Sequence, residues 1–403
     1  MPRRTPDYAL KIIGISFGFT LAFIILEIAA RFLPASDTFS QKLPLICKSP
    51  ILSFSEVDQD CLFQRLERTS AVYTKGRFPP FPVYALKTSN DIGQYSDVDF
   101  SETTTRRPGI LPIISIGDSY VEALQVSNSE AFHGLLNQYI SNKGKKIRST
   151  AIGNSGNPLS QYLVSAMFAK KSLDNENSIF IFSIISNDFD ESVIGGKAVQ
   201  FGGVFKLNED GGSEHIFINR NSSSEITIRR TIFNISALSR YFTMNFGIHK
   251  LGHTYPFCMF ASFPCDEIKT YKANILDTSE SADFQRYENS RKASDIFLME
   301  ISKLRESFTE RKNTLFVIDA DRQHIYDASI QKSEYFEIQR KYFINKAKSY
   351  GFTVIDMEPV FSDHFKKHKQ KFEFSNDRHW NSLGHEIVSK EIAKELNLTP
   401  KTQ

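Results

Sequence analysis

The residues most suited to nucleophilic chemistry lie in Gly117-Asp118-Ser119. This tripeptide directly follows the apolar run Leu111–Ile116. Such a run predicts a buried strand, and a turn after it presents Ser119 at the carboxyl edge of a sheet, where open α/β sheets bind ligands. A serine hydroxyl becomes a nucleophile when a base lies close by, so the segment predicts acyl chemistry.

A base and its partner occur near the C-terminus, in Asp377-Arg378-His379. We expect His379 to take the proton from Ser119. Asp377 is expected to fix the tautomer of the imidazole ring and to stabilise its protonated form. The three side chains form a candidate catalytic set.

Two further segments supply candidate donors for an oxyanion hole. Gly156 lies in a Gly-rich loop after the second predicted strand, where glycine lets a backbone N–H approach a substrate without side-chain obstruction. Asn187 follows the third predicted strand, and its amide is a neutral donor worth roughly 3–4 kcal/mol in comparable sites. The N–H of Ser119 is the third candidate donor.

Each segment also has a structural interpretation. Asp118, Asp188 and Asn381 have side chains that commonly cap turns or helices. A lone histidine such as His379 is more often structural than catalytic, and we interpret His385 as structural or as support on the last helix. Polar clusters after successive strands, in a workable order, favour the catalytic interpretation.

The elements that must position these residues alternate between strand and helix. This succession predicts a parallel sheet covered by helices on both faces. Helices are expected over residues 131–140, 159–167, 334–350 and 383–396. The interval 195–281 breaks the rhythm with Gly-rich turns and alternating stretches, and we expect a β-rich insertion near the rim of the site. The five predicted strands are Leu111–Ile116, Ile147–Ile152, Ser178–Ile185, Thr314–Asp319 and Phe352–Met357.

The N-terminus carries an apolar stretch that ends near Glu27 and resumes weakly to Arg31. Its length approaches the ~20 residues of a bilayer span, and no convincing cleavage site follows, which favours an uncleaved signal anchor over a removed signal peptide. Positive residues before the stretch place the N-terminus in the cytoplasm. The predicted organisation is a cytoplasmic N-terminus (1–11), a transmembrane signal anchor (12–33), a stalk and lead-in (34–110) and the catalytic domain (111–400).

The composition of the chain limits the classes of partner and cofactor that the protein is expected to bind. The formal net charge is only +3, which argues against nucleic acid as a partner. No zinc-binding spacing occurs, so no metal or cofactor is expected. Four cysteines in an exported domain predict disulfides, with Cys47–Cys61 and Cys258–Cys265 favoured by proximity among three connectivities. Four unpaired thiols are the alternative.

The motifs resemble the conserved blocks of the SGNH (GDSL-like) hydrolases over roughly residues 111–200 and 312–396. The blocks are Gly117-Asp118-Ser119, Gly156, Asn187 and the pair Asp377 and His379. The chain looks closest to the bacterial branch with an N-terminal membrane anchor, which also resembles it in Asn90–Gly93. Two positions depart from the family pattern: Asn376 stands where the acid commonly lies, and Ser186 replaces a glycine.

The resemblance implies a flavodoxin-like doubly wound sheet. It also implies Ser119 as nucleophile, His379 as base, and Ser119, Gly156 and Asn187 as the oxyanion hole. The implied activity is a serine esterase or O-acyltransferase, working through an acyl-serine on O-acetylated envelope or exported glycans. Its expected place is the periplasmic or extracellular side of the inner membrane, beside polysaccharide machinery. The alternatives are an esterase of lipids or small molecules and a non-catalytic glycan-binding or assembly protein.

Overall fold

The computed structural model describes most of the chain as helices, strands and connecting loops. The chain divides into two compact units, of residues 1–42, 72–84 and 222–265, and of residues 43–71, 85–221 and 266–403. All predicted site residues belong to the second unit. The described residues are 5–32, 51–58, 62, 70–75, 83–105, 107–173, 178–193, 202–208, 212–218, 236–238, 280–375 and 377–401.

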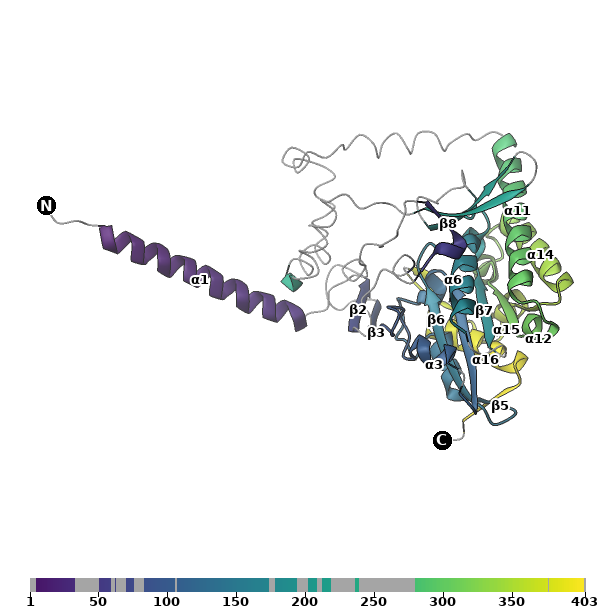
Figure 1. Cartoon of the computed structure of the whole chain (residues 1–403), viewed down its shortest axis with the longest axis horizontal. Coiled ribbons are helices and arrows are strands. Elements are labelled where there is room, and N and C mark those ends of the chain that lie inside the picture. Colours follow the sequence, from purple (N-terminus) through teal and green to yellow (C-terminus); the bar gives the residue numbers. More distant parts are fainter. Residues whose placement is uncertain are drawn as a thin grey trace. The chain divides into compact units, whose positions relative to one another are not determined.

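A seven-stranded sheet forms the centre of the second unit (Figure 1). Five of its strands are parallel, and in chain order they lie side by side as 2-1-3-4-5, the flavodoxin-like order. The prediction of a flavodoxin-like sheet is confirmed, and every predicted strand end lies within one residue of the observed end. The parallel strands are β4 (Ile110–Gly117), β6 (Lys146–Gly153), β7 (Ile179–Ile184), β10 (Thr314–Ile318) and β11 (Thr353–Asp356).

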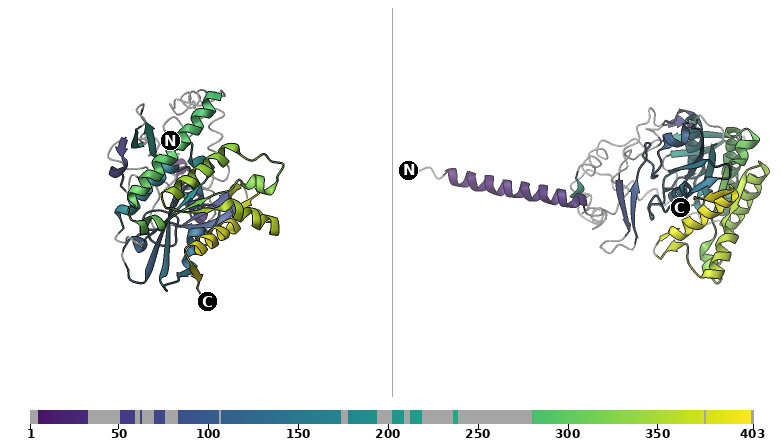
Figure 2. Two further views of the ribbon diagram at one scale, coloured as in Figure 1. Left: turned by 90° about the vertical axis from the view of Figure 1, so that its right-hand side faces the viewer. Right: turned by 90° about the horizontal axis from the view of Figure 1, so that it is seen from below.

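Helices cover both faces of the sheet, because alternate strand side chains point to opposite sides (Figure 2). Ile114, Phe182 and Phe316 pack toward one layer of helices, and their neighbours Ile113 and Ile181 pack toward the other. The first layer consists of α6 (Leu159–Lys171), α11 (Glu280–Leu304) and α14 (Glu334–Ser349), and the second of α5 (Phe132–Leu135), α15 (Met357–His368) and α16 (Ser382–Glu395).

The helix predicted over residues 131–140 is much shorter than expected. It consists of α5 and a 3-10 turn, η3 (Leu136–Gln138), after which Tyr139 and Ile140 enter strand β5 (Tyr139–Ser141). This strand pairs antiparallel with β6 and with β14 (Leu398–Pro400). A short apolar run is compatible with the periodicity of a helix or of a strand. Here it forms a strand, because backbone partners from other parts of the chain pair with it.

The described part of the interval 195–281 is β-rich, as predicted. Strands β8 (Gly202–Leu207) and β9 (Ser213–Ile218) pair antiparallel and are joined by β1 (Ile51–Ser53). The sheet packs on α6, where Ser160 donates its hydroxyl to the Gly203 carbonyl at 2.6 Å. All four cysteines, and therefore the predicted disulfides, lie outside the described residues.

The segment before the sheet is tied to the end of β6. The side-chain amide of Asn90 donates to the Thr150 hydroxyl at 3.1 Å, and Gly153 N–H donates to the Gln94 side chain at 3.0 Å. This lead-in therefore supports the loop that follows β6. Its elements are the 3-10 turn η2 (Phe54–Glu56), β2 (Ser70–Lys75), β3 (Val83–Thr88) and α3 (Phe100–Thr104).

Five further short elements belong to the second unit. They are α4 (Ser119–Glu122), α12 (Phe308–Lys312), α13 (Arg322–Tyr326), and the paired strands β12 (Glu373–Phe374) and β13 (Asp377–Trp380).

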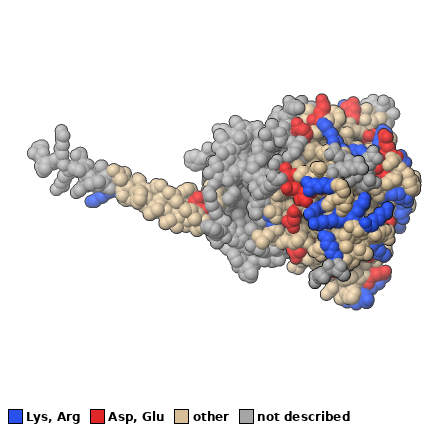
Figure 3. Space-filling model, turned by 60° about the horizontal axis from the view of Figure 1, so that its bottom comes forward, with Lys and Arg blue, Asp and Glu red and all other residues tan. Residues whose placement is uncertain are grey.

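Helix α1 (Thr5–Phe32) belongs to the first unit. Its segment Lys11–Ala30 has a mean hydropathy of 2.3 and is long and apolar enough to cross a membrane. Most of the helix surface in Figure 3 is free of charged side chains. Glu27, which interrupts the apolar stretch, accepts hydrogen bonds from the Ser236 hydroxyl at 2.9 Å and from the Leu238 N–H at 3.0 Å.

Candidate active site

Ser119 stands at the turn from β4 into α4. Asp118 caps this helix, because its side chain accepts a hydrogen bond from the Tyr120 N–H at 2.9 Å. The second oxygen of Asp118 accepts the Ser119 hydroxyl at 3.1 Å. The tight turn therefore holds the serine at the carboxyl edge of the sheet, as the sequence predicts.

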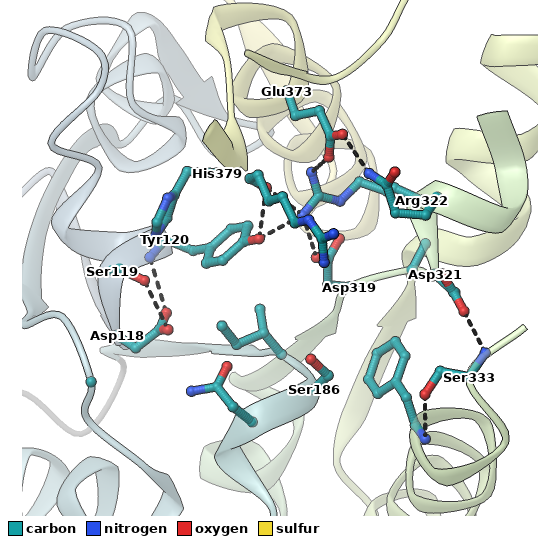
Figure 4. Close-up of a pocket in the computed structure, with 17 residues that line it drawn as sticks. Asp118, Ser119, Tyr120, Ser186, Asp319, Asp321, Arg322, Ser333, Glu373 and His379 are labelled. Carbon is teal, nitrogen blue, oxygen red and sulfur yellow. Dashed lines mark hydrogen bonds and ion pairs between the residues drawn. The ribbon is translucent and has the colours of Figure 1, made fainter. Parts of the chain in front are cut away.

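A cavity of about 450 Å³ opens beside Ser119 (Figure 4). Ser119, Gly156, Asn187 and His379 all contribute to its lining. These residues follow three different strands of the sheet and a separate hairpin. The fold thus brings four of the five predicted site residues to one cavity.

The fifth, Asp377, lies behind His379. Asp377 and His379 share one face of strand β13, because residues two apart in a strand point the same way. One carboxylate oxygen of Asp377 binds Nδ1 of His379, and the other accepts the amide of Gln125 at 3.2 Å. An acid two residues before the histidine is therefore able to orient the ring. Asn376 lies outside the described residues.

The loop that carries Gly156 is held by Glu122, the last residue of α4. The buried Glu122 carboxylate accepts the Ser155 N–H at 2.7 Å and also binds the Ser155 hydroxyl. Gly156 has a φ of +81°, which favours glycine. A Cβ on Gly153 would lie 2.4 Å from the Glu122 backbone nitrogen, so this loop and α4 approach too closely for any side chain there.

Asn187 lies in the 3-10 turn η4 (Ser186–Asp188), directly after β7. Its side-chain nitrogen donates to Glu191 at 2.9 Å. An amide nitrogen carries two hydrogens, so this bond orients the group while leaving a second donor for a ligand. Ser186, which replaces the glycine of the family pattern, also lines the cavity.

A network around Arg322 was not predicted from the sequence. The guanidinium is almost fully buried and forms ion pairs with Asp319 at 3.2 Å and Glu373 at 2.7 Å. It also donates to the Arg378 carbonyl at 2.7 Å, next to His379. Asp319 ends the fourth predicted strand and Arg322 lies three residues after it, so a search at the ends of the predicted strands, as for Ser119, Gly156 and Asn187, would also have identified them.

Tyr120 completes the support of His379, the candidate base. Its ring lies 5.0 Å from the His379 ring, and its hydroxyl donates to the Arg378 carbonyl at 2.9 Å. On the other side, Tyr120 meets the indole of Trp380 edge-on at 4.9 Å. His379 is therefore held through both its side chain and its backbone neighbours.

Among the residues given a structural alternative, Asp188, Asn381 and His385 have capping or packing roles. Asn381 caps α16 by accepting the Gly384 N–H at 3.0 Å, and Asp188 accepts the Ile185 N–H at 2.8 Å. His385 is buried beside Phe132, and burial lowers its pKa well below the usual range. A neutral, structural His385 agrees with the sequence interpretation. Among the described residues, no three His, Cys, Asp or Glu side chains are placed to share a metal ion.

Burial raises the pKa of Asp118 to about 6, although the Tyr120 N–H and nearby His379 oppose this rise. The folded pKa lies above the unfolded value, so the folded state holds the proton more tightly. The contribution of Asp118 to the free energy of unfolding is therefore greatest below about pH 4, and it is lost as the pH rises through about 6. We expect a loss of about 2 kcal/mol between pH 4 and pH 7, at 1.36 kcal/mol per pKa unit.

Urea unfolding of the full-length protein in mild detergent measures this loss. Trp380, the single tryptophan, is buried and reports on the unit that contains the site. In the Asp118→Asn variant the corresponding decrease should be absent. An unchanged decrease in the variant would assign it to other groups.

Residues 279–403 match the protein family described as "SGNH hydrolase-like domain, acetyltransferase AlgX". No curated protein sequence matches the chain.

Solved structures that are similar to this chain include two lipolytic proteins and an esterase. A lipolytic protein of the G-D-S-L family from Veillonella parvula is 11% identical, covers 71% of this chain and 97% of its own, and has a TM-score of 0.34. A lipase from a goat rumen metagenome has the same identity and coverages with a TM-score of 0.36. An acetylxylan esterase from Geobacillus stearothermophilus is 10% identical, with coverages of 74% and 99% and a TM-score of 0.35.

The family match lies in the part of the chain that contains Asp377 and His379. The remaining motif residues, Ser119, Gly156 and Asn187, meet this pair at one edge of the sheet. Residues 279–403 are therefore similar to the SGNH hydrolase-like domain, and the order of the motifs and the flavodoxin-like sheet agree with this match.

Proposed function

We propose that the protein is a serine-dependent acyl ester hydrolase or O-acyltransferase that acts on O-acetylated glycans. The observation that carries the proposal is the convergence of Ser119, His379, Gly156 and Asn187 on one cavity, with Asp377 bound to His379. Each element of acyl transfer through a covalent serine is present: a nucleophile, an oriented base and candidate oxyanion donors.

In the proposed reaction the Ser119 oxygen attacks the ester carbonyl, and Nε2 of His379 takes the hydroxyl proton. Since Nδ1 of His379 is bound to Asp377, Nε2 is the nitrogen left for this transfer. The Ser119 hydroxyl donates a hydrogen bond to Asp118 in this structure, and it must first turn from Asp118 toward His379. Catalytic hydrogen bonds commonly form only once the substrate is bound.

The negative oxygen of the tetrahedral intermediate is stabilised by the Ser119 and Gly156 N–H groups and the Asn187 amide. Collapse breaks the bond to the sugar oxygen, which receives the proton from His379, and leaves acyl-Ser119. Water then yields a free acid, whereas a sugar hydroxyl yields a new ester.

We also propose that α1 is an uncleaved anchor in the inner membrane, with the second unit on the periplasmic or extracellular side. Glu27 binds Ser236 and Leu238, far along the chain, so cleavage after α1 would remove a partner of the insertion. Two alternatives remain: a lipid or small-molecule esterase, and a non-catalytic glycan-binding protein. The described lining is rich in charged and hydroxyl groups, which disfavours a long acyl chain.

The test is covalent labelling of the full-length protein in detergent with a fluorophosphonate probe. We expect one label, located by mass spectrometry on Ser119, together with turnover of p-nitrophenyl acetate. Ser119→Ala should lose both. The matched control is Ser115→Ala, a buried serine two residues before the end of β4, and it should keep both. A folded wild-type protein without label or turnover would contradict an activated serine.

A further inference from the structure

A second, smaller cavity of about 180 Å³ adjoins the site. It shares Ser186, Asn187, Ser333 and Phe336 with the first cavity, so the two form one continuous cleft. Ser119 lies in the first part only. A ligand longer than the acyl group and one sugar would therefore extend from Ser119 into the second part.

The far wall of the second cavity is preorganised. Arg286 donates from Nε to Asp190 at 2.6 Å, and its guanidinium lies 3.6 Å from the ring centre of Tyr335. The Tyr335 hydroxyl in turn binds Ser290 at 2.5 Å. These contacts fix each side chain in place before a ligand arrives, which lowers the entropic cost of binding.

The wall is also polar. Arg286 covers a face of the Tyr335 ring, and apart from Phe336 every described lining residue carries a hydroxyl, amide or charged group. An acyl chain placed there would desolvate Asn187, Glu191 and Arg286 without hydrogen bonds in return. Sugar hydroxyls, in contrast, both donate and accept. The cavity is therefore suited to a second sugar residue.

The charge of the cleft selects among glycans. Its described lining includes three arginines, and two of these, Arg286 and Arg322, already form ion pairs with carboxylates. Six lining residues are acidic: Asp118, Asp190, Glu191, Asp319, Asp321 and Glu373. An anionic sugar placed along this lining meets net repulsion, whereas a neutral or amino sugar does not.

We propose that the second cavity is a subsite for the neighbouring sugar, and that the cleft accepts neutral or amino-sugar glycans and disfavours uronate polymers. This inference deepens the proposed function and rests on it for the position of the acylated sugar. It assigns Asp190, Arg286 and Tyr335 to binding of the chain rather than to acyl transfer.

Binding is measured first, because it does not depend on turnover. Full-length Ser119→Ala protein in detergent is titrated with acetylated xylo-oligosaccharides, which are neutral, and with acetylated oligogalacturonides of equal length. At low salt we expect the neutral series to bind at least about tenfold more tightly, a difference of 1.4 kcal/mol. At 0.5 M salt the difference should shrink, because salt screens repulsion between accessible charges. Equal or tighter binding of the uronates would overturn the charge selection.

Chain length tests the subsite itself. Affinity should rise between the acetylated monosaccharide and the trisaccharide, and this gain should fall about tenfold in the double variant Asp190→Asn/Arg286→Gln. Removing both charges together leaves no buried carboxylate unpaired, and Trp380 fluorescence verifies the fold. If the double variant keeps the full gain in affinity between the monosaccharide and the trisaccharide, the second cavity is not a sugar subsite. Ser119-dependent turnover of p-nitrophenyl acetate separates these failures from failure of the proposed function, since that ester is too short to enter the second cavity.

Discussion

Replacing His379 by alanine is expected to lower kcat for ester hydrolysis by about 10⁴-fold or more, with little change in KM. In the proposed mechanism the ring supplies the base for Ser119 and the acid for the leaving oxygen, and it makes these contributions in the transition state. Assays of the full-length protein with p-nitrophenyl acetate measure the effect. Asp377→Asn, which keeps the shape of the bond to Nδ1 but not its charge, should cause a smaller loss.

Imidazole provides a sharper test of this role. The His379 side chain is partly exposed and lines the cavity, so free imidazole is able to reach the space that the alanine leaves. We expect added imidazole to restore part of the lost rate in His379→Ala and none in Ser119→Ala. His368→Ala, an exposed histidine on α15, is the matched control and should keep the wild-type rate. Absence of rescue together with a small loss would contradict a catalytic base at this position.

Replacing Arg322 by lysine is expected to lower kcat by about 10²-fold. Lysine retains the charge but lacks the planar fork, so it is unable to bind Asp319, Glu373 and the Arg378 carbonyl together. The backbone before His379 then loses one of its supports, and a displacement of about 1 Å at a catalytic group costs on the order of 10²-fold in rate.

The fold must be followed separately for this residue, because its partners are buried. Arg322→Ala leaves Asp319 and Glu373 without their cation and should lower the free energy of unfolding by about 3–5 kcal/mol. Arg340→Lys is the matched control: Arg340 is similarly buried and pairs with Glu337 and Asp356, but it does not line the cavity. We expect Arg340→Lys to lower the free energy of unfolding about as much as Arg322→Lys does, and to leave kcat unchanged. If Arg322→Lys and Arg340→Lys lower kcat equally, the effect of Arg322 on catalysis arises from a general loss of folded structure.

Much of the architecture could be predicted from local sequence. The five parallel strands are short runs of apolar residues that are buried on both faces, so their signal is strong and needs no partner to interpret. Ser119, Gly156 and Asn187 could be located because each follows such a strand. The helix predicted over 131–140 was too long, because Tyr139 pairs with Pro400, and Ile140 pairs with Lys146 and Thr399.

The support of the site could not be predicted in the same way. Glu122, Gln125 and Tyr120 look like ordinary residues of a helical turn, and only the folded chain brings them to Ser155, Asp377 and the Arg378 carbonyl. Their partners lie up to 258 positions away in the chain, and the periodicity of a local segment carries no information about contacts at such a separation.

The sequence by itself determined the sheet and located the candidate nucleophile and base, because the residues that make up each of these signals are adjacent in the chain. The tertiary structure decided how the base is held, through Arg322, Tyr120 and Gln125. It also decided that the cleft continues past Asn187 to Arg286. Hydrogen bonds and ion pairs between distant segments form only when the sheet and its hairpin are assembled, and they define which side chains a substrate meets.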